Sequence, residues 1–502
     1  MSSTLLTAEI PDQLDERKHS QRPKKIGFVS LGCPKNLVDS EVMMGLLKQA
    51  GAELTSNAEE ADVIVVNTCS FIDCAKRESV DTILEMARLK AQGRARKLVV
   101  AGCLVERYRD EIQKNIPEVD AVIGTGELAR ILAATDLAGT NSPHKNLQEQ
   151  RSPFVILPSR PEAEARWAQG RFSRTTWDGA SSELPTYLYN ETTPRMLTTP
   201  KYCAYIKIAE GCDHPCSFCI IPQLRGKFRS RAMASVMAEA ERLVCSGVRE
   251  ITLVGQDTTC YGEDLGLEDG LAFLLKQLAA ITDLQWIRFL YAYPNKITPR
   301  LLETIAKYEN ICSYIDVPLQ HASPSILRRM KRGGGAEVFL RSIERMRRII
   351  PNLVLRTSFI VGFPGESEPE FEQLCDFVRH AEFDWMGTFA YSDEEGAAAY
   401  SLDGKLPAAE IGRRRKELLR VQRQVSRKKK KALVGKKFRL LLEGPSLETA
   451  LLLEGRTEMH APDIDGKVFI NDVPEGRSIV AGEFFDARIT AAHDYDLIAE
   501  IL

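Results

Sequence analysis

The sequence lacks any long hydrophobic run. Its apolar stretches have the length of single strands, and none approaches the run of about 20 apolar residues that a membrane-spanning helix requires. The N-terminus is polar and has no apolar core of the kind found in secretory signal peptides. We therefore expect a cytoplasmic protein without membrane contact, whose 502 residues allow about three domains.

An excess of charge of one sign is also absent, because 67 Lys and Arg residues oppose 69 Asp and Glu residues. The charges are nevertheless placed unevenly along the chain. Residues 413–437 contain thirteen Lys or Arg and one Glu, whereas residues 438–502 contain five Lys or Arg and thirteen Asp or Glu. A basic segment therefore leads directly into an acidic C-terminal module.

Cysteine, in contrast, is plentiful, with twelve residues in the chain. Reducing conditions inside cells keep thiols free, so these cysteines are not expected to form a disulfide framework. Metal-binding or catalytic roles gain weight for those cysteines that show ligand spacing. The cysteines without such spacing are interpreted as structural, and they are Cys74, Cys203, Cys245, Cys260, Cys312 and Cys375.

Two regions alternate short apolar runs with helix-length segments, which is typical of parallel α/β structure. Residues 24–140 contain four such runs and predict an open parallel α/β sheet. Residues 199–434 contain six units and predict an incomplete (β/α)6 barrel of the TIM type. Residues 1–23 are expected to form a disordered tail. Residues 141–198, rich in Pro, Ser, Arg and Glu, are interpreted as a linker or insertion.

The C-terminal segment has a different pattern. Residues 435–502 contain five short β-rich runs broken by Gly, Pro, Asn and Asp. Such a pattern predicts a small antiparallel β-barrel of the OB-like kind. The fold class is therefore a multidomain α/β protein that ends in a β-barrel.

The sharpest motif is a C-x3-C-x2-C loop, Cys212, Cys216 and Cys219, directly after the first strand of the predicted barrel. Three thiolates from one loop can hold three irons of a [4Fe–4S] cluster and leave the fourth iron open to another ligand. The position agrees, because barrels of this type place active sites at the C-terminal ends of their strands. A Cys3His zinc site is the alternative, although His214 lies between two of the cysteines, an awkward place for a fourth tetrahedral ligand.

A second set of cysteines is dispersed along the N-terminal region. Cys33, Cys69 and Cys103 each end a predicted strand, in the segments SLGC, VNTC and VAGC. The carboxyl ends of neighbouring parallel strands converge on one crevice, so the three thiols could form a single ligand set. The alternative for each cysteine taken alone is an ordinary buried thiol.

The C-x3-C-x2-C loop and its setting resemble the radical S-adenosylmethionine (SAM) superfamily. The resemblance implies that Cys212, Cys216 and Cys219 bind a [4Fe–4S] cluster whose open iron is chelated by SAM. The resemblance further implies that SAM is contacted by Phe218, Gly255, Gln256 and Gly362, which occupy positions at which the superfamily binds it. The alternative for Phe218 is an ordinary core aromatic residue, and the alternative for the glycines is a tight turn.

From about residue 24 to residue 502, the chain is similar to the radical SAM methylthiotransferases. SLGCPKNLVDSE at residues 30–41 and GRTEMHAPDIDG at residues 455–466 are similar to the RimO type, which modifies an aspartate on small-subunit ribosomal protein twelve. The resemblance implies that Cys33, Cys69 and Cys103 hold a second [4Fe–4S] cluster and that the C-terminal barrel is a TRAM domain. It also implies that a SAM-derived radical removes hydrogen from the aspartate β-carbon, after which sulfur and a methyl group are added.

The implied partners are the ribosomal protein or the assembled ribosomal subunit and an external electron donor. The basic segment could touch ribosomal RNA or be a solvated helix face. A tRNA adenosine methylthiotransferase is the nearest alternative, and the acidic C-terminal module argues against it because RNA binding favours basic surfaces. A non-catalytic RNA-binding protein is a further alternative, but it would not explain the predicted six-unit barrel. An electron-transfer protein would need fully ligated clusters, whereas each set here offers only three cysteines.

Overall fold

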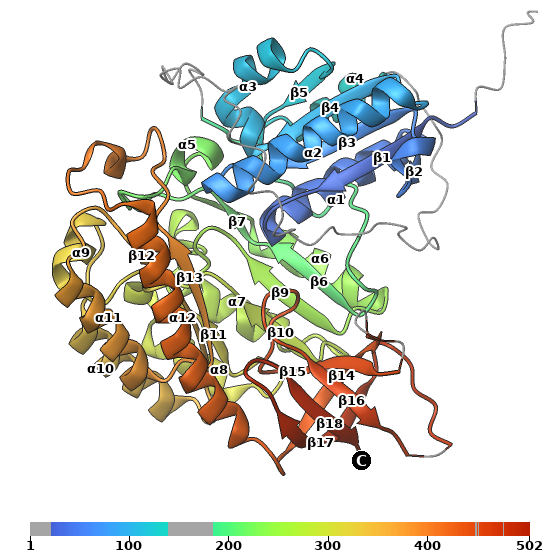
Figure 1. The fold of residues 1–502 in the computed structure, drawn as a ribbon. Coiled ribbons are helices and arrows are strands. Elements are labelled where there is room, and N and C mark those ends of the chain that lie inside the picture. Colours follow the sequence, from blue (N-terminus) through green and yellow to red (C-terminus); the bar gives the residue numbers. More distant parts are fainter. Residues whose placement is uncertain (1–21, 139–183, 447–448, 450, 475) are drawn as a thin grey trace, which may run out of the picture.

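The computed structural model describes residues 22–138, 184–446, 449, 451–474 and 476–502. Most of the predicted tail at residues 1–23 and residues 141–183 of the predicted linker lie outside the described residues. The N-terminal sheet lies at one end of the central domain and the C-terminal barrel lies at the other (Figure 1). No described helix is both long and apolar enough to cross a membrane.

The N-terminal domain is an open parallel sheet, as predicted, and its strand order is β2-β1-β3-β4-β5. The short edge strand β2 is additional to the four predicted runs. Both faces are buried, because Val63 and Val65 of β3 pack on the α1 side and Ile64 and Val66 pack on the α2 side. The helix after the first strand begins at Pro34, since proline suits the first helical turn. The elements are β1 (Lys25–Ser30), α1 (Pro34–Gln49), β2 (Glu53–Thr55), β3 (Val63–Thr68), α2 (Asp73–Gln92), β4 (Lys97–Gly102), α3 (Cys103–Asn115), β5 (Ala121–Ile123) and α4 (Ile131–Ala134).

The central domain contains six parallel strands in two three-stranded sheets, β6-β9-β10 and β11-β12-β13. An isolated parallel bridge between Ile287 of β10 and Ile311, three residues before β11, connects the two sheets, and the predicted incomplete barrel is confirmed. Its strands are β6 (Cys203–Lys207), β9 (Glu250–Val254), β10 (Trp286–Phe289), β11 (Tyr314–Asp316), β12 (Val354–Val361) and β13 (Trp385–Ala390). Its helices are α5 (Ile221–Arg225), α6 (Met233–Cys245), α7 (Gly270–Leu278), α8 (Pro299–Lys307), α9 (Pro324–Arg329), α10 (Ala336–Ile349), α11 (Glu368–Ala381) and α12 (Ala408–Lys431).

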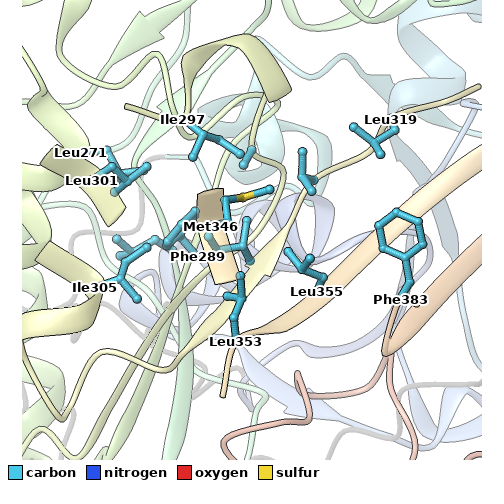
Figure 2. Packing of buried hydrophobic residues seen from close by; sticks show 14 of the residues in the cluster. Leu271, Phe289, Ile297, Leu301, Ile305, Leu319, Met346, Leu353, Leu355 and Phe383 are labelled. Carbon is cyan, nitrogen blue, oxygen red and sulfur yellow. The ribbon is translucent and has the colours of Figure 1, made fainter. Parts of the chain in front are cut away.

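The helices of the central domain pack on its strands through one hydrophobic core. Phe289 of β10 and Leu355 of β12 belong to the same buried cluster as Leu301 of α8 and Met346 of α10 (Figure 2). Burial of each such side chain contributes about 1.5–3 kcal/mol. The core therefore fixes the strand ends and, with them, the loops that carry polar side chains.

The C-terminal domain is a closed barrel with the strand order β14-β15-β16-β18-β17. The predicted small barrel is confirmed, but one pairing, between β16 and β18, is parallel. A closed ring with an odd number of strands cannot alternate direction throughout, so one parallel pairing is required. The strands are β14 (Lys437–Pro445), β15 (Leu453–Thr457), β16 (Val468–Asp472), β17 (Phe484–Ala492) and β18 (Leu497–Ile501).

The segment between β15 and β16 enters the central barrel where its strands begin. Trp385, the first residue of β13, donates from Nε1 to the Met459 carbonyl at 2.7 Å. Tyr314, the first residue of β11, donates from its hydroxyl to Asp465 Oδ2 at 2.7 Å. Met459 is buried in the same hydrophobic cluster as both aromatic residues. The C-terminal barrel is therefore anchored opposite to the strand ends that lead into the cysteine loops.

Candidate active site

The three dispersed cysteines lie at the carboxyl edge of the N-terminal sheet. Cys33, Cys69 and Cys103 directly follow, or lie within three residues of, the ends of β1, β3 and β4, which are neighbours in the sheet. Burial raises the pKa of the Cys69 thiol to about 12, and the nearby Cys103 and Cys33 thiols add to this rise. The structure therefore brings the three side chains to one place, here called the N-terminal triad.

Two glycines allow the chain to turn sharply just before these cysteines. Gly32 has φ +91°, and a Cβ there would lie 2.8 Å from Cys69 Cβ. Gly102 has φ +95°, and a Cβ there would lie 2.3 Å from Asn67 Oδ1 and 2.6 Å from the Thr68 carbonyl. Only glycine combines this backbone conformation with such close approach. The glycines of the segments SLGC and VAGC thus allow the loops that carry the N-terminal triad to approach one another closely.

The C-x3-C-x2-C cysteines form the central triad, in the loop between β7 (Ala209–Glu210) and α5. Burial raises the pKa of Cys212 to about 11 and that of Cys219 to about 12, and the Cys216 thiol contributes to both rises. Arg332 Nη1 lies 3.6 Å from Cys216 Sγ and donates to it. A cation therefore lies beside this triad, where it would stabilise thiolate ligands.

The spacing of the thiols does not suit a single metal ion. Among the described side chains, one group offers three ligand atoms within 4.8 Å of one another, and it is His214, Asp257 and Cys260 rather than either triad. Four-coordinate zinc, with Zn–S bonds of about 2.3 Å, holds its sulfur ligands within about 4 Å of one another. A [4Fe–4S] cluster binds each thiolate to a different iron and spreads them more widely. Both donor sets therefore fit a polynuclear cluster.

His214 is engaged away from the central triad, which weakens the zinc alternative. Its Nε2 lies 2.6 Å from Asp257 Oδ2, and its ring stacks on Tyr293 with the centroids 3.8 Å apart. Cys260 Sγ donates to the same Asp257 oxygen at 3.1 Å. His214 and Cys260 therefore both contact the carboxylate of Asp257.

The short helix α5 connects the two triads. It begins two residues after Cys219, and its Leu224 packs with Ile220 against Cys103 in a small hydrophobic cluster. Its last residue, Arg225, donates from Nη2 to Cys103 Sγ at 3.2 Å. One five-residue helix thus reaches from the last ligand of the central triad to a member of the N-terminal triad.

A buried network of four charges surrounds this contact. Arg225 Nη1 donates to Asp39 Oδ2 at 2.5 Å, and Lys207 Nζ pairs with both Asp39 and Glu210. Burial alone would raise the pKa of Glu210, but the Lys207 and Arg225 cations lower it to about 2. Glu210 is therefore ionised, and the network matches two acidic side chains with two basic ones. Removing one member would leave an uncompensated buried charge, at a cost of about 3–5 kcal/mol.

A second buried ion pair joins the two domains. Arg107 of α3 donates from Nη1 to Glu394 Oε2, in the loop after β13, at 2.6 Å. The side chains are 1% and 2% exposed, and Lys76 of α2 contacts the same carboxylate at 2.8 Å. The N-terminal domain is therefore fixed to the active face of the central domain at two points.

The four expected SAM contacts lie near the central triad or at turns of the central domain. Phe218 is partly buried against the central core, and Gly255 directly follows β9. Gln256 Nε2 donates to Glu210 Oε1 at 2.5 Å, which ties this position to the charge network. Gly362 has φ +76°, and a Cβ there would lie 2.5 Å from Ile411 of α12. Backbone geometry and packing alone therefore require glycine at position 362.

Four residues at the site were not identified from the sequence pattern, namely Lys35, Arg225, Tyr293 and Arg332. Lys35 lies within the segment SLGCPKNLVDSE, two residues after Cys33, and Arg225 follows Cys219 by six residues. Proximity to a ligand cysteine was the available signal for these two. Tyr293 and Arg332 reach the site only through the barrel fold.

The sequence matches three family profiles in the order of the three domains. They are described as Uncharacterized protein family UPF0004 over residues 25–124, Radical SAM superfamily over residues 206–378 and TRAM domain over residues 434–502. Together with the cysteine loop in the incomplete barrel, these matches define a radical SAM enzyme with an additional N-terminal cysteine site.

Similar proteins narrow the class. The protein "Ribosomal protein uS12 methylthiotransferase RimO" of Koribacter versatilis is 67% identical over 96% of this chain and 97% of its own length. The protein of the same name in Solibacter usitatus is 54% identical over 95% of both chains. A solved structure of the radical S-adenosylmethionine methyltransferase TsrM from Kitasatospora setae aligns with a TM-score of 0.48 at 16% identity, covering 73% of this chain and 72% of that one. The chain belongs to the RimO family of radical SAM methylthiotransferases.

Proposed function

We propose that the chain adds a methylthio group to the β-carbon of an aspartate on small-subunit ribosomal protein twelve. Cys212, Cys216 and Cys219 hold the [4Fe–4S] cluster that binds SAM, and the N-terminal triad holds a second [4Fe–4S] cluster. Together these groups supply a radical able to remove hydrogen from carbon, sulfur for the new bond, and the methyl group. Phe218, Gly255, Gln256 and Gly362 contact SAM in this proposal.

The observation that carries the proposal is the short path between the triads. Helix α5 follows Cys219 and ends at Arg225, which donates to Cys103 at 3.2 Å. Radical formation and sulfur transfer must act on the same carbon, so their two sites must face one substrate position. The charge network and the Arg107–Glu394 pair hold the domains in that arrangement.

The chain's own side chains orient the reactants and exclude water. Arg225 and Arg332 each donate to one cysteine of a triad and stabilise its thiolate. Gln256, hydrogen-bonded to Glu210, extends the fixed polar network toward the expected SAM position. Because both carboxylates of this network are matched by cations, they are poor candidates to act as bases, which suits a reaction that proceeds by hydrogen abstraction.

The choice of a protein substrate is supported by the relatives and by charge. Both relatives quoted above carry the name of a ribosomal protein uS12 methylthiotransferase. Residues 438–502 have eight more acidic than basic side chains, which favours a basic protein over RNA. The reaction on a ribosomal protein also implies a cytoplasmic location and an external electron donor.

The basic helix α12 offers less surface to ribosomal RNA than its composition suggests. Arg413, Arg414 and Lys428 pair with carboxylates of Glu368, Glu366 and Glu382. Lys430 is buried and lies 3.5 Å from the centroid of the Trp385 ring. We therefore restrict the proposed RNA contact to exposed side chains near the end of the helix, such as Lys431, its last residue.

Mass spectrometry tests this function. The cluster-loaded chain is incubated anaerobically with reductant, SAM and the small-subunit ribosomal protein, and the aspartates are examined for a methylthio group. We expect the product with the wild-type chain and none with Cys216→Ala. SAM cleavage without a modified aspartate would reject the substrate, and tRNA would then be the next substrate to examine.

A further inference from the structure

Lys35 is a cation that reaches across the domain interface beside the N-terminal triad. It lies in the first turn of α1, two residues after Cys33. Its ammonium Nζ lies 3.3 Å from the centroid of the Tyr291 ring, which follows β10 of the central domain. The lysine therefore stands at the C-terminal mouth of the barrel, where active sites of this architecture lie.

The tyrosine under this ammonium has an unusual backbone. Tyr291 has φ +65°, a left-handed conformation that is uncommon for an aromatic residue. Asp316 stabilises it, because Asp316 Oδ2 accepts a hydrogen bond from the Tyr291 backbone nitrogen at 2.9 Å. Such conformations concentrate at ligand-binding sites, where the surrounding structure holds a side chain in a required place.

Lys35 differs from the other charged residues of this interface in its partners. Asp39 and Glu41 on the same helix pair with cations of the central domain or of the segment before it. Lys35, by contrast, has no carboxylate partner among the described residues, and its ammonium contacts the ring of Tyr291 and hydrogen-bonds to that side chain. The first turn of α1 contains no acidic residue either. The helix dipole does not favour a lysine there, because its N-terminal end is positive.

An anionic group brought to this place would meet an excess of negative charge. The carboxylates of Asp39 and Glu210 are already balanced by Lys207 and Arg225, whereas the cysteines contribute thiolates when they hold metal. A substrate carboxylate can be buried there only with a cation of its own. Lys35 can supply that cation.

We propose that Lys35 binds the side-chain carboxylate of the substrate aspartate and thereby selects aspartate over asparagine. This inference rests on the proposed function, in which the reacting β-carbon is bonded directly to that carboxylate. The Tyr291 ring holds the Lys35 ammonium in place before substrate binds. An ammonium–carboxylate contact fixes the neighbouring carbon between the two triads.

Binding measurements without turnover test this role. The cluster-loaded full chain, with SAM omitted, is titrated with the ribosomal protein and with its variant that carries asparagine in place of the target aspartate. We expect the wild-type chain to bind the aspartate form about 10- to 100-fold more tightly. Lys35→Met should bind both forms with equal affinity, and Lys35→Arg should retain part of the preference.

Lys48→Met, at the far end of the same helix, is the matched control and should keep the wild-type preference. Iron content and the visible absorbance of Lys35→Met show whether the clusters persist. A preference for aspartate that survives in Lys35→Met, a wild-type chain without preference, or loss of iron from Lys35→Met would each overturn the inference. Failure of the wild-type chain to modify the ribosomal protein would instead reject the proposed function.

Discussion

The Arg225 guanidinium donates a hydrogen bond to Cys103 Sγ at 3.2 Å, although the two residues belong to different domains. Arg225 also pairs with Asp39 of α1 and donates from Nη2 to Asn36 Oδ1 at 3.2 Å. A single side chain of the central domain thus contacts a triad cysteine and two residues of the helix that follows Cys33. The relative position of the two triads depends on this contact.

Replacing the buried cation Arg225 should destabilise the chain far more than replacing an exposed cation nearby. Arg225→Met leaves Asp39 and Glu210 with Lys207 as their one remaining cation, so the free energy of unfolding should fall by about 3–5 kcal/mol. Thermal or denaturant unfolding of the metal-free chain measures this change. Lys227→Met, at an exposed position in the next loop, should change stability by less than about 0.5 kcal/mol.

A double substitution sharpens this test. In the pair Asp39→Asn and Arg225→Met, one charge of each sign is removed, so the loss should be smaller than the sum of the two single losses. Additive losses would show that the two side chains act independently and would contradict the network.

The glycine before Cys103 should be indispensable for the N-terminal triad. Gly102→Ala places a Cβ at φ +95° within 2.6 Å of two oxygen atoms, so we expect a loss of more than about 2 kcal/mol and reduced iron at this site. Gly412→Ala is the control, because it lies within α12 and its Cβ would contact nothing within 4 Å. That control should be stabilised by up to about 1 kcal/mol. Equal effects on unfolding would refute the argument.

The central triad should account for half of the bound iron. In the triple variant Cys212→Ala, Cys216→Ala and Cys219→Ala, iron should fall from about eight to about four atoms per chain. Iron and acid-labile sulfide assays on the anaerobically reconstituted chain give this count. Cys245→Ala, which removes an exposed cysteine without ligand spacing, should keep the full content. An unchanged count in the triple variant would rule out a cluster at this triad.

The anchor of the C-terminal barrel should contribute strongly to stability. Arg456 of β15 donates from Nη2 to Glu250 Oε2 at 2.8 Å, and the two side chains are 3% and 0% exposed. Arg456→Met should therefore lower the free energy of unfolding by about 3–5 kcal/mol. Arg488→Met breaks the exposed pair with Glu500 and should cost at most about 1 kcal/mol. Similar losses in both variants would show that the Glu250 contact is unimportant.

Much of the fold follows from local patterns. The apolar runs that end in SLGC, VNTC and VAGC are strands buried on both faces, and a parallel sheet necessarily brings their carboxyl ends together. The C-x3-C-x2-C loop follows the first barrel strand as predicted. These features depend on strand periodicity and on chain order, both of which are visible in the sequence.

Contacts between domains could not be predicted in this way. Arg225 and Cys103 are 122 residues apart, and Lys35 and Tyr291 are still more distant. Their partners depend on how three domains pack, which no local period encodes. The entry of residues 458–465 into the central barrel is of the same kind, because it requires the shapes of both barrels.

Removal of the N-terminal triad alone tests most directly whether both triads are needed for the reaction. Wild-type chain and the triple variant Cys33→Ala, Cys69→Ala and Cys103→Ala are compared by mass spectrometry of one reaction, in which 5′-deoxyadenosine and methylthio-aspartate are both quantified. We expect the variant still to cleave SAM, because the central triad is intact, but to form no methylthio-aspartate. Methylthio-aspartate formed by the variant would contradict the joint action of the two triads.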